Sequence, residues 1–239
     1  MPADIHEIAP DLFRISTFIP EIDLAFNQFL LRDERPLLYH TGMKALFPEV
    51  RAAVAQLIDP AKLAYISFSH FEADESGALN QWLEAAPQAE TVVGMIGAMV
   101  NMGDYAIRPA RGLVDGETFS TGKYRLRFLA TPHLPHGWDA GLLFEETRRT
   151  LFCSDLMHQN GKSVPISSNV IEGVRNSLAA YEKTPMHSYM PFGPRTEKQI
   201  DRLIELKPQT LAIMHGASFS GEGAAALRAY KDVRASLLS

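Results

Sequence analysis

The chain has 239 residues, 46% of them hydrophobic, so it can bury a sizeable core in one domain or two. It carries 23 basic and 28 acidic side chains, and no basic block marks a surface for nucleic acid. No apolar stretch is long enough to cross a membrane, and we see no secretory signal at the N-terminus. The single cysteine, Cys153, excludes an internal disulfide. We therefore expect a cytoplasmic protein.

Short β-type runs open the sequence and lead through a helix to an apolar central strand. No linker, repeat or low-complexity tract divides the chain, so we expect a single domain over residues 1–239. The strands expected in the first half span 12–18, 25–32, 36–40, 63–68 and 91–93, and the helices span 46–57, 78–86 and 96–102.

The second half repeats this order, with strands first and helices mostly after them. Its strands are expected at 112–114, 118–119, 124–130, 140–145, 150–154 and 210–214, and its helices at 171–181, 197–205 and 222–238. Two mixed halves of this kind predict an α/β (α+β) protein in which each half forms a sheet with outer helices. Stacking the two sheets would give a four-layer αββα sandwich.

The segment 69–77 is unusually rich in groups that bind metals. It places His70, Glu72, Asp74 and Glu75 within six positions, directly after the apolar run 63–68. The end of a buried strand is a place where a rigid sheet can hold a reactive site on a loop. Three of the four groups are carboxylates, which favours iron or manganese over zinc.

Further candidate ligands follow three other predicted strands. His133 and His136 come after the strand at 124–130, Asp155 after 150–154, and His215 after 210–214. A single His or Asp at a strand end is more often a hydrogen-bonded structural residue or a turn former. Four strand ends that each deliver such a group are harder to explain by structure alone, and their convergence would make a binuclear metal cage.

The pattern His70-x-Glu72-x-Asp74, followed by His136, Asp155 and His215, resembles the di-iron domain of the flavodiiron proteins, which belongs to the metallo-β-lactamase-like superfamily. Ordinary hydrolases of that superfamily have H-x-H-x-D-H at the first motif. Other segments also have counterparts in the family, namely 25–28, 86–89, 115–118, 151–155 and 215–216. The resemblance implies the following ligands: His70, Glu72 and His136 for one iron, Asp74 and His215 for the other, and Asp155 between them.

Glu75 departs from the family, which has a His at this position as a further ligand of the second iron. Glu75 could coordinate directly, act through a water, or leave the second iron more open. An ionised Glu75 would also offset one positive charge of a diferrous pair, and we therefore expect it to lower the reduction potential.

The residues around these ligands are assigned with the help of the same resemblance. His136 is preferred to His133 because residues 137–140 stand where the family has Trp-Pro-Asp-Ser. We expect His133, Trp138 and Tyr189 to surround the ligands. The remaining candidates have a structural alternative or lack a recognisable partner motif: Phe71 and Phe192 as wall or packing residues, Cys153 as a core residue, and His6, His40, His158 and His187 without a motif.

The resemblance also implies a function. Flavodiiron proteins continue into a flavin-binding domain, whereas this chain ends at Ser239 and has no C-x-x-C pair. We therefore expect no flavodoxin-like domain, no FMN and a separate electron donor or signalling partner, as in the stand-alone oxygen-binding di-iron proteins. Two irons, with manganese or zinc as the alternative metals, would bind O2 for sensing, or reduce O2 or NO. The family's head-to-tail pairing implies a homodimer. The alternative function is a binuclear metallohydrolase that acts on an ester, thioester or lactam.

Overall fold

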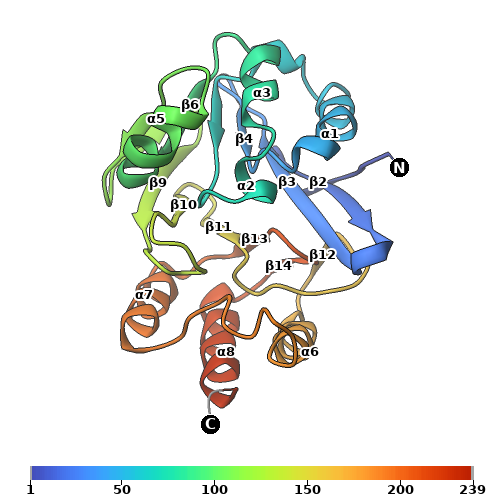
Figure 1. Ribbon diagram of the computed structural model, residues 1–239, viewed down its shortest axis with the longest axis vertical. Helices are drawn as coiled ribbons and strands as arrows, with labels where there is room; N and C mark the ends of the chain where they lie inside the picture. Colours follow the sequence, from blue (N-terminus) through green and yellow to red (C-terminus); the bar gives the residue numbers. More distant parts are fainter. Residues whose placement is uncertain (1, 238–239) are drawn as a thin grey trace.

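The computed structural model describes residues 2–237, which form two stacked sheets of seven strands each (Figure 1). The strands of the first sheet lie side by side in chain order: β1 (Asp4–Ala9), β2 (Leu12–Ile19), β3 (Leu24–Leu31), β4 (Leu37–Tyr39), β5 (Tyr65–Ser67), β6 (Glu90–Gly94) and β7 (Arg111–Leu113). The second sheet has the order β12 (Ile166–Ser167), β14 (Ser218–Ser220), β13 (Thr210–Ile213), β11 (Thr150–Ser154), β10 (Gly141–Glu145), β9 (Arg125–Ala130) and β8 (Thr118–Ser120).

Helices flank the outer face of each sheet (Figure 1). The first half contributes α1 (Phe47–Val54), α2 (Ala73–Ser76), α3 (Leu79–Ala85), α4 (Met95–Gly97) and α5 (Gly103–Tyr105), and the second half contributes α6 (Ile171–Tyr181), α7 (Pro194–Glu205) and α8 (Gly223–Ser236). A π-helical stretch at Ala98–Met102 joins α4 to α5, and short 3-10 turns lie at Pro20–Ile22, Lys44–Leu46 and Pro60–Lys62. No helix among residues 2–237 is both long enough and apolar enough to cross a membrane.

Strand alternation divides the core into three apolar layers. In β4, Leu37 and Tyr39 face the layer between the sheets, while Leu38 faces α1 and α3. In β11, Phe152 joins the inter-sheet layer, while Leu151 and Cys153 pack in the layer that contains α6, α7 and α8. Successive strand residues point to opposite faces, so each sheet buries one face against its partner sheet and the other against helices. The predicted four-layer αββα sandwich is confirmed.

The strands and helices expected from the sequence are present, with ends shifted by a few residues. The helix expected at 96–102 is longer, because α4, the π-helical stretch and α5 follow one another without a break. Residue 238, the end of the last predicted helix, lies outside the described residues. Four elements were not predicted: β1, α2, β12 and β14. The last three have two to four residues each, which is too short for a periodic pattern to show.

The topology brings several strand ends to one edge of the molecule. β9 and β11 are both antiparallel to β10, and β13 is parallel to β11, so these three strands run in the same direction. Their carboxyl ends therefore meet at one edge of the second sheet. The first sheet is attached there by two backbone bonds, from Asn27 N to Met214 O (2.9 Å) and from Gly141 N to Ser69 O (3.0 Å).

Candidate metal centre

Side chains from four strand ends meet at this edge of the sheets. His70 lies three residues beyond β5 and leads into α2, which carries Asp74. His136 lies in the loop from β9 to β10. Asp155 directly follows β11, and His215 lies two residues beyond β13. The four segments come from both sheets, so the site straddles the joint between the two halves of the chain.

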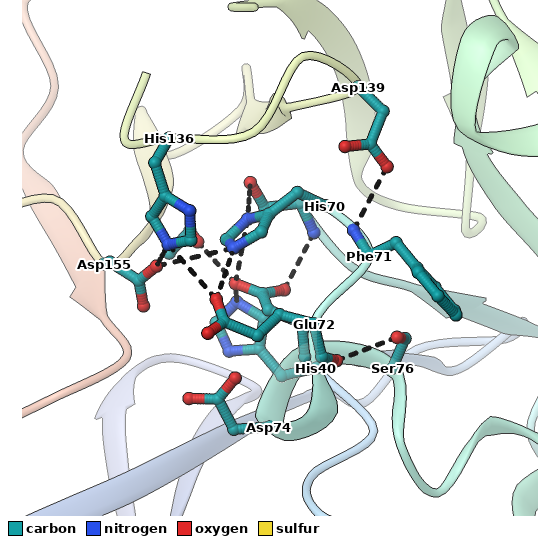
Figure 2. Close-up of polar contacts among 12 residues, drawn as sticks. His40, His70, Phe71, Glu72, Asp74, Ser76, His136, Asp139 and Asp155 are labelled. Carbon is teal, nitrogen blue, oxygen red and sulfur yellow. Dashed lines mark hydrogen bonds and ion pairs between the residues drawn. The ribbon is translucent and has the colours of Figure 1, made fainter. Parts of the chain in front are cut away.

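A first group of donors contains three of these side chains together with Glu72, and the ligand atoms of His70, Glu72, His136 and Asp155 all lie within 4.8 Å of one another. The Glu72 Oε2 atom lies 3.0 Å from His70 Nε2 and 3.1 Å from His136 Nε2, and Asp155 Oδ2 lies 3.0 Å from His136 Nε2. Figure 2 shows the four side chains pointing toward one another. Two imidazole nitrogens and two carboxylates therefore converge on one point.

A second group contains Asp74, Asp155 and His215, also within 4.8 Å of one another. His215 Nε2 lies 3.1 Å from Asp155 Oδ1 and 3.4 Å from Asp74 Oδ2. Asp155 thus offers Oδ2 to the first group and Oδ1 to the second. A carboxylate shared in this way is the arrangement needed to bridge two metal ions.

Two of the three imidazoles, those of His70 and His215, are held in place by a hydrogen bond at Nδ1. His215 Nδ1 lies 2.8 Å from Ala25 O, and His70 Nδ1 lies 3.1 Å from Ser69 Oγ. The bond from His215 Nδ1–H to a backbone carbonyl fixes its tautomer and leaves the Nε2 lone pair for a metal. Such outer contacts are typical of metal-binding histidines.

The protonated imidazoles and the ionised carboxylates of the cluster stabilise each other strongly. Burial opposes protonation of His136 and His215, but hydrogen bonds to the carboxylates outweigh it and raise the pKa of each to about 10. Hydrogen bonds from His136 and His70 lower the pKa of Glu72 to about 2. Burial opposes ionisation of Asp155, yet His136 and His215 hold its pKa well below the usual range. A cation bound here would take the place of the imidazole protons.

The donor set fits a pair of iron ions better than a pair of zinc ions. Three carboxylates and three imidazoles, with no thiolate, match the ligands preferred by iron and manganese. The buried Asp74 Oδ1 has no hydrogen-bond partner among the described residues, so it is free to bind a cation. Glu72 has a side chain 45% exposed and His136 one 21% exposed, whereas His70, Asp155 and His215 are buried. The site therefore opens to solvent on the side of Glu72 and His136.

Glu75 lies outside both groups. Its carboxylate is fully buried, accepts a bond from Ser69 N (2.9 Å) and another from the Ser154 hydroxyl, and lies 3.5 Å from His40 Nε2. Burial raises the pKa of Glu75. Its oxygens are engaged by this network, so the geometry favours an indirect role for Glu75 over direct coordination.

Of the other residues expected around the site, some lie beside the ligands and others lie away from them. Tyr189 lies beside it, with its ring 5.6 Å from that of His136, whereas His133 is exposed and is not among the grouped donors. Trp138 is 49% exposed and lines an apolar cavity of about 310 Å³ with Met95 and Phe128. Figure 2 shows the Phe71 ring pointing away from the ligands, and its centroid lies 5.1 Å from that of the Tyr105 ring.

Three residues near the centre, His40, His158 and Tyr181, had no recognisable signal in the sequence, and a fourth, Asp139, lies in the segment 137–140 but was not named as a site residue. His40 faces Glu75, and His158 packs against His215 with ring centroids 4.7 Å apart. Tyr181 contacts His158, and Asp139 accepts bonds from Phe71 N and from the Asn101 side chain. Burial and the neighbouring His215 lower the pKa of His158 to about 3. A His at the end of a tight turn after a predicted ligand, as at 158, is the only pattern that could have suggested it.

Comparison with known proteins agrees with this geometry. The model of the family described as ODP family beta lactamase matches residues 24–216. The chain is 27% identical over 202 residues to rubredoxin-oxygen oxidoreductase from Megalodesulfovibrio gigas, which covers 82% of this chain and 49% of that protein. It is 26% identical over 213 residues to nitric oxide reductase from Moorella thermoacetica, covering 86% of this chain and 52% of that protein. The chain thus spans about half the length of these relatives.

Solved structures share the fold. Rubredoxin oxygen:oxidoreductase from Desulfovibrio gigas superposes with a TM-score of 0.81 at 23% identity, covering 96% of this chain and 61% of that one. A fragment, residues 1–254, of putative diflavin flavoprotein A 5 from a Nostoc species has a TM-score of 0.81 at 18% identity and covers 99% of this chain and 97% of that one.

Proposed function

Because the chain belongs to the family described as ODP family beta lactamase, we propose that it is a non-haem di-iron protein that binds O2, either to sense it or to reduce O2 or NO. Its relatives include proteins named rubredoxin-oxygen oxidoreductase and nitric oxide reductase, which supports O2 and NO as the candidate ligands. A separate electron donor and a cytoplasmic homodimer are part of the same proposal.

One observation carries the proposal: Asp155 offers one oxygen to each of two adjacent donor groups. A single metal would use only one group, whereas two metals need a shared ligand between them. Two irons held there would supply redox chemistry for O2 or NO, which are small enough to enter on the more exposed side near Glu72 and His136.

The protein side chains would contribute charge and position. The carboxylates of Glu72, Asp74 and Asp155 offset positive charge, which favours the higher oxidation state of iron. The imidazoles of His70 and His215 are held by Ser69 Oγ and Ala25 O, so they present Nε2 in a fixed direction.

The test is metal identity together with the response to O2. Protein purified without added metal should contain two irons per chain, and the reduced protein should develop a new visible absorption band on exposure to O2. One iron per chain, or two irons without a spectral change, would count against the proposal. Two zinc ions together with hydrolysis of an ester, thioester or lactam would favour the hydrolase alternative. Glu72 argues against that alternative, because hydrolases of this fold place a His there.

A further inference from the structure

The two donor groups differ in their number of imidazoles. The first group has two histidines, His70 and His136, whereas the second has only His215 beside two carboxylates. The carboxylate at position 75, which could have served the second group, is bound instead to Ser69 N and the Ser154 hydroxyl. The second group therefore has three protein donors where the first has four.

His158 lies against this less complete group. It is buried, its backbone N–H donates to Asp155 O, and its ring centroid lies 4.7 Å from that of His215 with the planes tilted by 45°. The two histidines of the first group have a similar relation, with centroids 4.3 Å apart and an interplanar angle of 68°. The spacing of His158 and His215 is thus close to that of two rings that converge on one donor site.

The two nitrogens of His158 have different surroundings. Nε2 lies 2.7 Å from Asn160 Oδ1, and because that oxygen is an acceptor, Nε2 carries the proton and Nδ1 carries the lone pair. Nδ1 is buried and has no hydrogen-bond partner among the described residues. Leaving a buried polar atom unpaired is costly, so such an atom in a native protein calls for an explanation.

We propose that His158 binds the second metal through Nδ1 and supplies the imidazole that position 75 does not. The inference rests on the proposed di-iron function. His158 is not among the donors that lie within 4.8 Å of one another. Binding through Nδ1 therefore requires its ring to move toward Asp155 and His215. Its Nε2–H bond to Asn160 then plays the part that Ala25 O plays for His215.

The first test needs no substitution. In chain labelled with ¹⁵N-histidine and loaded with Zn²⁺ as a diamagnetic probe, long-range ¹H–¹⁵N spectra distinguish rings bound through Nε2 from rings bound through Nδ1. The structure presents Nε2 of His70, His136 and His215 to the centre. The expected result is a single ring bound through Nδ1, with its assignment at His158. If every bound ring uses Nε2, the inference is wrong.

The second test compares His158→Gln with His6→Gln, an exposed histidine on β1 that serves as the matched control. In anaerobic titrations of metal-free protein with Fe²⁺, His158→Gln should weaken binding of the second equivalent by at least about tenfold, since even loss of an outer contact to a ligand costs 10–100-fold. The first equivalent and the His6→Gln variant should be unchanged. Unaltered binding of both equivalents in His158→Gln would overturn the inference and leave the di-iron proposal standing, whereas failure of the wild-type chain to take up two metals would overturn both.

Discussion

Substitutions at Glu75 separate a hydrogen-bonding role from a role as a metal ligand. In Glu75→Ala, the Ser69 N–H and the Ser154 hydroxyl lose their buried acceptor. In Glu75→Gln, the amide oxygen can still accept from Ser69 N, while the amide NH2 can reach the Ser154 oxygen and His40 Nε2, which lies 3.5 Å from Glu75 Oε1. His40 Nε2 has no hydrogen-bond partner among the described residues, so it can accept such a bond.

The expected magnitudes follow from this count of hydrogen bonds. A buried donor left without an acceptor costs about 1–3 kcal/mol. The Ser154 hydroxyl can rotate toward another acceptor, so its share lies at the low end, and Glu75→Ala should lose about 2–4 kcal/mol of unfolding free energy. For a chain of this size that corresponds to a fall in Tm of roughly 5–15 °C. Glu75→Gln should stay within about 1 kcal/mol of the wild type.

The assay is urea unfolding of the metal-free protein followed by circular dichroism, with iron uptake measured in parallel. If Glu75 acts only through its hydrogen bonds, Glu75→Gln should bind two irons as tightly as the wild type does. The reasoning is refuted if Glu75→Ala is as stable as the wild type, or if Glu75→Gln is fully stable yet loses the second iron, because the latter result would make Glu75 a ligand.

Four further outcomes are expected. Asp155→Asn should weaken binding of both iron equivalents by at least about tenfold in metal titrations, because this residue faces both donor groups. Trp82→Ala should cost about 3–5 kcal/mol in urea unfolding, since the indole is fully buried between α3 and the first sheet. A hydrogen bond to Lys123 is the main cause that lowers the pKa of Asp11 from 3.8 to about 2. Asp11 therefore contributes stability above about pH 4, and this stability is lost as the pH falls toward 2. The difference in unfolding midpoint between the wild type and Asp11→Asn should shrink over that range. Glu75→Gln should raise the reduction potential of the irons in a redox titration, on the order of tens of millivolts, if the carboxylate is ionised in the loaded protein.

The strands and helices could be predicted from the sequence because they depend on local patterns, whereas the stacking of the two sheets was expected mainly from the family resemblance. The run 63–68 is apolar and ends at a cluster of polar groups, and strands at 124–130, 150–154 and 210–214 end in the same way. Such patterns indicate where the chain is buried and where it turns, and both depend on a few neighbouring residues. The short strands β12 and β14 gave no such pattern, since each depends on the strand it pairs with, and the sequence predicted a helix at 96–102 without its π-helical geometry.

The residues that converge on the candidate centre could be named from the sequence, because His70, Asp155 and His215 each follow a strand and match a family motif. Their surroundings depended on the tertiary structure. Glu75 neighbours Asp74 in the chain, yet its carboxylate turns toward Ser154, 79 positions away. His158 had no motif, and only the packing of two loops places it against His215. The chain's own pattern determines which segments reach the edge of the sheets, whereas the direction of each side chain depends on hydrogen bonds and packing between segments distant in sequence, which no local pattern encodes.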